Sequence, residues 1–305
     1  MSHFLSPVFA PGFFQSSLVQ IAVVIGALAA VVSAVVGVFT VLRGQSFAGH
    51  AFGDIEATGG SGAYLVGIGP LLGFLIAAVI GAVAMEAIGI QRVRGRDLAT
   101  GIVLGAALGL AALFLYLETT ASSTTGATIS VLFGSLFAVS SSTIPLVILL
   151  SAVAVTIIAV LFRPLLLSSI SPELAAARGI PVRLIGALYL LSLAVAAALA
   201  AITIGAILST ALLIGPAATA LRLTRSPGRA MLSAGLLGVA ATWIGIVLAY
   251  DSFLWPPVKQ GWPVSFFVVT LVLVFYLLAG LPAAVRARAA RTDQRARATA
   301  SGLAG

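Results

Sequence analysis

The stretch SLVQIAVVIGALAAVVSAVVGVFTVL, residues 17–42, contains no charged side chain. An α-helix rises 1.5 Å per residue, so about 20 such residues cross the roughly 30 Å hydrocarbon core of a bilayer. Apolar and polar residues do not alternate in this stretch or in the other apolar stretches with the period of two that barrel strands require. The sequence therefore predicts an all-α, polytopic transmembrane helical bundle. The further apolar stretches near or above this length lie at about 64–90, 98–117, 143–162, 184–203, 205–221, 230–250 and 263–281.

The composition agrees with a membrane protein and excludes several functions. Apolar residues make up 61% of the 305-residue chain and charged residues only 8%, against about 25% charged in soluble domains. The chain has no cysteine, which excludes disulfide scaffolds, thiolate metal sites and cysteine nucleophiles. Its two histidines, His3 and His50, are too few for a multi-histidine catalytic metal centre. The sequence also lacks the catalytic signatures G-x-x-x-x-G-K-[ST], H-E-x-x-H and G-x-S-x-G, so we expect no enzymatic activity and no bound cofactor.

The basic residues orient the chain in the membrane. All 15 arginines fall in breaks that belong on one side, and Lys259 alone falls on the other. Positive residues gather on the cytoplasmic side of membrane proteins, so we expect the N-terminus outside and the C-terminus in the cytoplasm. The net charge of +8 then reflects contact with anionic membrane lipids and not with nucleic acid. The predicted domains are an extracytoplasmic lead (1–16), a transmembrane domain (17–281) and a basic cytoplasmic tail (282–305).

The segment GQSFAGHAFGDIEATGGSGA, residues 44–63, must return the chain across the membrane. Arg43 and Arg92 both belong inside, and only one apolar span separates them. Polar, glycine-rich backbone is tolerated at membrane depth only where protein encloses it or it lines a wet cavity. We therefore expect a short, buried, polar crossing helix near 46–57 with an extended glycine-rich end, giving about nine crossings. A second short segment, 129–139, is expected to re-enter the membrane from outside.

Three ionisable residues of this polar helix, His50, Asp54 and Glu56, are candidate ligands for a permeating ion. The i, i+4 spacing puts His50 and Asp54 on one helix face, about 6 Å apart at Cβ. Imidazole and carboxylate together suit a divalent transition metal. Glu56 lies off this face and joins the pair only if the helix ends or bends. Ionisable residues within membranes generally serve function, although Asp54 could instead simply orient His50 through a hydrogen bond.

The break at 163–183 carries the signals of a short helix. Ser171 is a good N-cap, Pro172 and Glu173 suit the first turn, and Gly179 supplies a stop. We expect one amphipathic helix of about seven residues, lying in the cytoplasm between two spans. It is either a capped connector or a docking element for a soluble partner. The predicted docking residues are Ser171, Pro172, Glu173, Leu174 and Gly179.

The segment IGAILSTALLIGPAATAL, residues 204–221, is rich in small residues, which let helices approach closely in a membrane. Pro216 removes one backbone hydrogen bond from this predicted helix. Two interpretations remain open at this point. The segment either serves tight helix packing alone, or it forms a helix kinked at Pro216 beside the translocation pathway.

These elements, in this order, resemble the permease subunits of the zinc, manganese and iron group of ATP-binding cassette (ABC) importers. The resemblance is most specific at 170–182 (ISPELAAARGIPV) and 205–224 (GAILSTALLIGPAATALRLT), with weaker support at 40–54 and 131–140. It implies a bacterial cell-membrane permease that dimerises around a central path and moves a divalent metal ion. It also implies cytoplasmic ATPase subunits, which bind ATP and dock below, and an extracytoplasmic metal-binding protein that delivers the ion above.

Two other functional classes compete with this hypothesis. An ion-coupled secondary transporter would use His50, Asp54 and Glu56 as a relay, but the predicted docking helix and the lack of clear inverted halves oppose it. An intramembrane enzyme would need a nucleophile or a metal triad, which the sequence lacks. The leading hypothesis is a permease subunit of an importer for zinc, manganese or iron, with ATP hydrolysis on a separate partner.

Overall fold

The computed structural model describes residues 13–88, 96–122, 126–255 and 261–281. Within these ranges the elements are helices joined by turns, with no strand, so the predicted all-α class is confirmed. The short elements are α5 (Gly126–Phe133), α7 (Pro172–Ala177) and the 3-10 turns η1 (Phe13–Gln15), η2 (Leu136–Ala138), η3 (Ser141–Thr143) and η4 (Ser252–Leu254). The longer helices are α1 (Ser17–Leu42), α2 (Ser46–Val66), α3 (Pro70–Ile88), α4 (Arg96–Ser122), α6 (Ile144–Ile170), α8 (Val182–Ile204), α9 (Ser209–Leu223), α10 (Pro227–Asp251) and a C-terminal helix (Val264–Leu281).

Seven of the described helices are long and apolar enough to cross a membrane: α1, α3, α4, α6, α8, α10 and the C-terminal helix. The helix α2 is not among them because it is too polar, and α9 has only 15 residues. The predicted multi-span bundle is therefore confirmed in its class. The total of about nine crossings, which needs α2 and α9 as well, stays a prediction.

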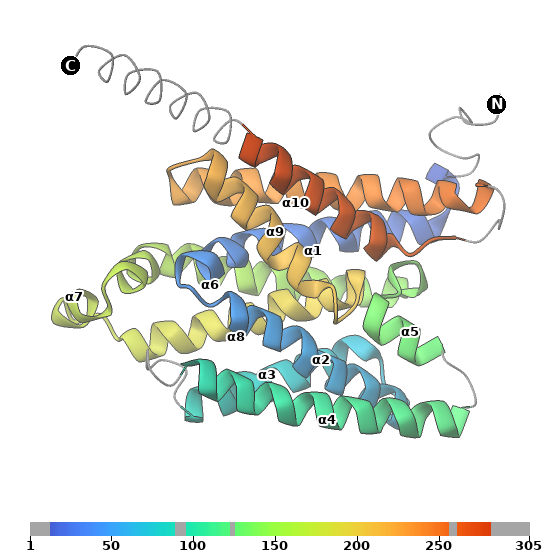
Figure 1. Cartoon of the computed structure of the whole chain (residues 1–305), viewed down its shortest axis with the longest axis horizontal. Helices are drawn as coiled ribbons and strands as arrows, with labels where there is room; N and C mark the ends of the chain where they lie inside the picture. The colour runs from blue at the N-terminus through green and yellow to red at the C-terminus, as the bar shows by residue number, and fades with distance from the viewer. Residues whose placement is uncertain (1–12, 89–95, 123–125, 256–260, 282–305) are drawn as a thin grey trace, which may run out of the picture.

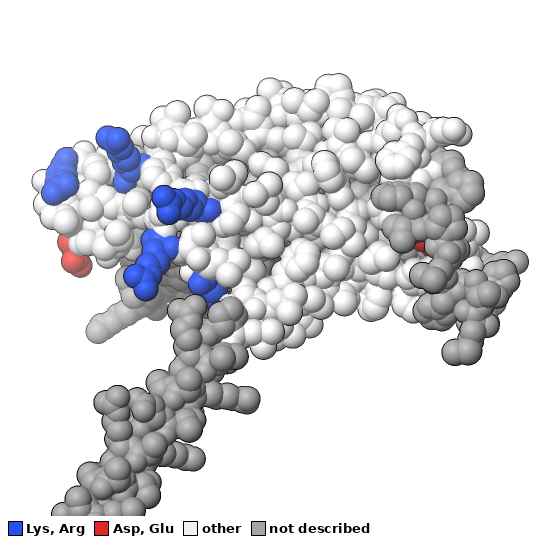
Figure 2. Space-filling model, turned by 90° about the horizontal axis from the view of Figure 1, so that it is seen from above, with Lys and Arg blue, Asp and Glu red and all other residues white. Residues whose placement is uncertain are grey.

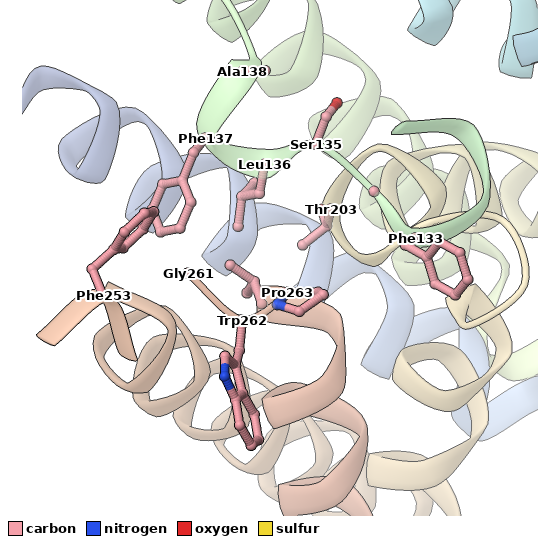
Figure 3. A pocket seen from close by; sticks show the side chains of 12 residues that line it. Phe133, Ser135, Leu136, Phe137, Ala138, Thr203, Phe253, Gly261, Trp262 and Pro263 are labelled. Atoms are coloured by element: carbon pink, nitrogen blue, oxygen red, sulfur yellow. The ribbon is translucent and has the colours of Figure 1, made fainter. Parts of the chain in front are cut away.

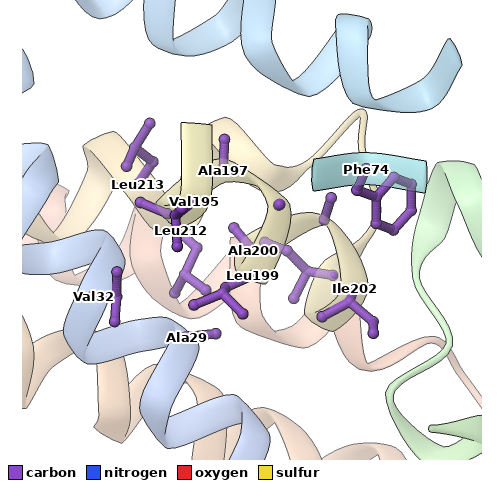
Figure 4. Packing of buried hydrophobic residues seen from close by; sticks show 14 of the residues in the cluster. Ala29, Val32, Phe74, Val195, Ala197, Leu199, Ala200, Ile202, Leu212 and Leu213 are labelled. Carbon is purple, nitrogen blue, oxygen red and sulfur yellow. The ribbon is translucent and has the colours of Figure 1, made fainter. Parts of the chain in front are cut away.

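The helix α8 runs through the middle of the bundle (Figure 1). It packs against α1, α6 and α9 on one side and against α2 and α3 on the other, with α4 outermost beside α2. Its sequence LYLLSLAVAAALAAITI, residues 188–204, has no charge, and its small alanines are buried. Figure 4 shows side chains of α8 between those of α1, α3 and α9. Small, uncharged side chains let these five neighbouring helices approach one central helix.

The glycine-rich end of the polar segment is helical, which corrects the prediction of a short helix near 46–57 with an extended end. The helix α2 continues to Val66. A Cβ atom at Gly59 would lie 2.0 Å from the Gly73 carbonyl oxygen, and one at Gly60 would lie 2.1 Å from the Phe74 ring. The glycines therefore provide the close packing of α2 on α3, and that packing stabilises a helix that intrinsic propensity disfavours.

The boundary between α2 and α3 consequently falls later than predicted. Gly67 ends α2 with a φ of +74°, and α3 begins at Pro70 and not at residue 64. Left-handed backbone of this kind is the usual conformation after a helix end, and glycine adopts it without a steric cost. The described part of the predicted span 64–90, residues 64–88, thus contains two elements, the last turn of α2 and the whole of α3.

The segment predicted to span 205–221 also begins later, at Ser209. Gly205 ends α8 with a φ of +87°, and a Cβ there would lie 2.2 Å from the Leu132 carbonyl oxygen. The Ala206 amide donates a hydrogen bond to the Val131 carbonyl at 2.9 Å. This contact seats the end of α5 on the α8–α9 connection. The predicted segment 129–139 is thus built from α5 and η2, and its entry into the membrane from outside stays a prediction.

Candidate functional site

His50 and Asp54 lie together on α2, as the sequence predicts. His50 Nε2 is 3.7 Å from Asp54 Oδ2, and 48% of the histidine side chain is exposed against 15% of the aspartate. This separation is too long for a direct hydrogen bond. It leaves an imidazole nitrogen and a carboxylate oxygen on one helix face, open on the histidine side.

Thr210, in the first turn of α9, is the third member of this site. Its Oγ1 atom lies 3.0 Å from His50 Nδ1. Metal-binding histidines generally use their second ring nitrogen for such a hydrogen bond, which fixes the ring orientation and the tautomer. Local sequence pattern marks Thr210 only as a small, polar residue of a predicted helix, because its partner is 160 residues away.

Glycines on α2 explain why α9 comes this close. A Cβ atom at Gly53 would lie 2.5 Å from Ser209 Oγ and 2.6 Å from the Ala206 carbonyl oxygen. A Cβ at Gly49 would lie 3.1 Å from the Leu213 side chain. Any side chain at Gly53 would therefore push α9 away from α2. The small residues of both segments bring Thr210 within reach of His50.

Glu56 does not join the pair. The helix continues past it, and two residues at 100° each turn Glu56 about 200° away from Asp54. Its side chain is completely buried, and its carboxyl oxygens have no hydrogen-bond partner among the described residues. Likewise, the described ranges hold no group of three or more His, Cys, Asp or Glu that could bind a metal ion together. The role of Glu56 as a ligand stays a prediction.

The short helix predicted after residue 170 is present as α7. The Leu174 amide donates to Ser171 Oγ at 3.2 Å, which caps its N-terminus. At the other end the amides of Gly179 and Ile180 donate to the carbonyls of Ala176 and Ala175, with Gly179 at a φ of +75°. This is a Schellman arrangement, which satisfies carbonyls that a helix end leaves free. The chain therefore holds a rigid six-residue helix between two long ones.

Three of the predicted docking residues lie on the exposed surface of α7, and their docking role stays a prediction. Pro172, Glu173 and Leu174 are exposed, Leu174 at 46%, whereas Ala175 is buried and anchors the helix. The arginine side chains shown in blue in Figure 2 gather at one end of the molecule. We call this end, which contains α7 and the start of α10, the basic end. Lys259, Arg92, Arg94 and the arginines of the tail lie outside the described residues.

Pro216 lies inside α9 and is buried. Its surroundings are α1 and α10, because a Cβ built at Gly238 would lie 3.4 Å from Ala30 and 3.7 Å from the Pro216 ring. A Cβ at Gly37 of α1 would overlap the Leu213 carbonyl at 1.9 Å. Tight packing against α1 and α10 is therefore a sufficient reason for the small residues of this helix. A kink beside the translocation pathway stays a prediction.

A pocket of about 250 Å³ lies at the end opposite the basic end (Figure 3). It is bounded by the segment that follows α5 and by the chain around Trp262, which stacks on Phe267. Aromatic side chains line it, among them Phe137 and Phe253 (Figure 3). None of the described residues that line it carries a carboxylate or an imidazole. The pocket is therefore suited to apolar contact and not to a metal ion.

Comparison with known proteins identifies the family. A profile of the ABC 3 transport family matches residues 15–291. The chain belongs to the ABC 3 transport family. It is 32% identical over 245 residues to the manganese transport system membrane protein MntC of Listeria monocytogenes, covering 79% of this chain and 85% of the relative. It is 29% identical over 243 residues to the manganese import system permease protein ScaB of Streptococcus parasanguinis, covering 80% and 85%.

A solved structure shares the fold of this ABC 3 family permease. PsaBC from Streptococcus pneumoniae in complex with Fab matches it with a TM-score of 0.74 at 24% identity, covering 88% of this chain and 93% of that chain. The predicted family resemblance is therefore confirmed, and the chain is a multi-pass membrane permease subunit, not the ATPase itself. The alternative of an ion-coupled secondary transporter is set aside, because the family belongs to ABC transporters.

Proposed function

We propose that this permease subunit serves an ABC importer whose cargo is manganese, carried as a divalent ion. The observation that carries the proposal is the His50–Asp54 pair, 3.7 Å apart, on a helix too polar to face lipid. Imidazole nitrogen and carboxylate oxygen suit Mn²⁺, Fe²⁺ and Zn²⁺, and the names of the relatives favour the first. A transported ion must also leave its site. Two ligands from one chain therefore suit transient binding better than a closed coordination shell does.

A second copy of the chain would complete this site. The 48% exposure of His50 leaves its open side available to a partner. In a homodimer around a central path, two His50–Asp54 pairs would face one another and offer four ligands to one ion. In this proposal Glu56 contacts the ion after the His50–Asp54 pair does. Its carboxyl is buried and would reach the ion only after α2 shifts against its neighbours.

We assign α7 to the docking of a cytoplasmic cassette ATPase. Its capped, rigid geometry and its exposed Pro172, Glu173 and Leu174 support this role. The helix α7 lies at the basic end, which then faces the cytoplasm by the positive-inside rule. With α2 and α9 as additional crossings, the chain has nine, an extracytoplasmic N-terminus and a cytoplasmic C-terminus. The extracytoplasmic metal-binding protein would deliver the ion at the opposite end, which carries the aromatic pocket around Trp262.

Metal accumulation by cells tests the proposed cargo. The chain, expressed with its ATPase and its delivery protein in a strain that lacks its own manganese importer, should restore Mn²⁺ accumulation more strongly than Zn²⁺ or Fe²⁺ accumulation. The matched control carries an ATPase whose P-loop lysine is replaced, which abolishes ATP hydrolysis. Preferential accumulation of zinc or iron would overturn the cargo. Equal accumulation with the inactive ATPase would overturn the importer itself.

A further inference from the structure

A polar cluster at the basic end joins three helices that are far apart in the sequence. We call it the Arg43 cluster; its residues are Thr40, Arg43, Ser168, Ser169 and Tyr189. Arg43, the residue that follows α1, donates from Nη1 to Ser168 Oγ at 3.1 Å and to Ser169 Oγ at 3.4 Å on α6. Its guanidinium carbon also lies 5.1 Å from the centre of the Tyr189 ring on α8.

The donor and the acceptor are defined in every hydrogen bond that the hydroxyl groups of this cluster make. Ser168 and Ser169 both donate to the Leu165 carbonyl, at 3.0 and 2.6 Å, and so accept from Arg43. The buried Tyr189 hydroxyl donates to Thr40 Oγ1 at 2.8 Å, and Thr40 donates to the Val36 carbonyl at 3.0 Å. Hydrogen-bond networks of this kind hold a defined arrangement in a low-dielectric interior. The guanidinium therefore fixes the end of α1 against α6 and α8.

The contact on α6 falls directly before the docking helix. Ser169 is two residues from Ser171, the N-cap of α7. Pro164 lies inside α6 five residues before Ser169, and a proline removes the hydrogen bond to the carbonyl four residues earlier. The last turns of α6 are thus weakly joined to the rest of that helix and rigidly joined to α7. Arg43 joins this segment to the end of α1 by hydrogen bonds.

On the side of α1, Arg43 lies just before the turn that leads into α2, the helix that carries His50 and Asp54. Gly44 follows Arg43 with a φ of +63°, and the Gln45 amide donates to the Thr40 carbonyl at 2.9 Å. The helix α2 then begins at Ser46, and His50 lies in its second turn. A displacement of Arg43 would therefore be transmitted through a tight, hydrogen-bonded turn to the start of the helix that carries His50.

We propose that Arg43 is a positioning residue that couples the docking helix α7 to the metal-pair helix α2. The proposal rests on the proposed function of α7 and of His50. When the ATPase moves α7, the turns after Pro164 move with it, and Arg43 carries that movement to the turn before α2. A purely structural role would predict loss of folded protein or equal loss of every activity. Coupling predicts that metal uptake is lost while ATP hydrolysis continues.

The test compares metal uptake with ATP hydrolysis in the same vesicles. Permease, ATPase and delivery protein are reconstituted together, and Mn²⁺ uptake and phosphate release are measured for wild type, Arg43→Gln and Arg43→Lys. Arg43→Gln should lower the ratio of uptake to hydrolysis about tenfold, with the ATPase still co-purifying. Arg43→Lys, which keeps the charge but loses the forked donor, should give an intermediate ratio. Arg229→Gln, an exposed arginine of the basic end, is the matched control and should leave the ratio unchanged.

A second variant covers the case in which Arg43→Gln does not fold. The double substitution Ser168→Ala with Ser169→Ala removes the acceptors on α6 but keeps Arg43 on the Tyr189 ring, and it should also lower the ratio. An unchanged ratio in the folded variants, or an equal fall of uptake and hydrolysis, would overturn the coupling role of Arg43. Failure of the proposed function looks different, because the wild-type vesicles would then show no ATP-dependent Mn²⁺ uptake.

Discussion

His50 Nδ1 and Thr210 Oγ1 lie 3.0 Å apart and join α2 to the first turn of α9. If the histidine donates its Nδ1 proton to the threonine, the Nε2 lone pair is free and lies on the side of Asp54. That tautomer is the one a metal ion needs. The opposite arrangement, with the threonine donating, would direct an Nε2 proton toward the carboxylate and leave no imidazole ligand. The proposed metal binding by the pair therefore depends on a residue of another helix.

Removing either member of the pair should reduce transport. His50→Ala and Asp54→Ala each remove one ligand, and we expect Mn²⁺ uptake to fall by more than about tenfold. Immunoblots of the membrane fraction should show unchanged amounts of protein, because neither side chain is part of the buried core. Glu86→Gln, which alters a carboxyl group of α3 outside the pair, is the control. Wild-type uptake in both single variants would reduce the pair to a structural contact.

Thr210 should act on metal affinity through His50. Thr210→Val keeps the shape of the side chain but removes the hydroxyl, so the imidazole loses its orienting partner. We expect the Mn²⁺ concentration at half-maximal uptake to rise about tenfold, the usual effect of losing such a partner. Thr210→Ser keeps the hydroxyl and should behave like wild type. Identical concentration dependence for the valine and serine variants would contradict this role.

Charge reversal on α7 should weaken docking. Glu173 lies in the first turn of the helix, where an acidic residue is stabilised by the helix dipole. Glu173→Arg opposes that dipole and reverses an exposed charge, so we expect the affinity for the ATPase to fall about tenfold, as for other interfacial charges. The measurement is the amount of ATPase that co-purifies with tagged permease. Unchanged co-purification together with unchanged ATP-driven uptake would refute the assignment of α7.

Cysteine labelling tests the orientation in the membrane, because the chain has no native cysteine. Ser226→Cys lies just before α10 at the basic end, and Trp262→Cys lies beside the aromatic pocket, both at exposed positions. A thiol reagent that cannot cross the membrane should label position 262 in intact cells and reach position 226 only after lysis. The reverse pattern would show that the basic end lies outside.

Close packing between α2 and α3 should make Gly59 sensitive to substitution. A Cβ there would lie 2.0 Å from the Gly73 carbonyl oxygen, so Gly59→Ala should lower stability by about 1–3 kcal/mol, as overpacking does. Gly101→Ala on α4 is the matched control, since nothing lies within 4 Å of its Cβ position. In detergent, the thermal midpoint should fall for Gly59→Ala and stay level or rise for Gly101→Ala. Equal thermal midpoints for the two variants would show that α2 and α3 can move apart with little loss of stability.

The sequence was sufficient to predict the helical class, most of the long spans, the short capped helix and the family. These features depend on local information, such as an uncharged run long enough for a bilayer or a serine placed before Pro-Glu. The i, i+4 spacing of His50 and Asp54 is also local, because two side chains on one helix need no further partner to share a face.

Tertiary structure decided what local patterns could not express. The glycines of 59–62 would favour a break in an isolated chain, yet α2 continues to Val66, because only there can α3 approach its backbone. Thr210 meets His50, and Arg43 meets Ser168, across separations of 160 and 125 residues. Glu56 is kept from the pair by the same continuous helix. Such contacts depend on the distance between packed helices. The size of the side chains at each helix–helix interface sets that distance.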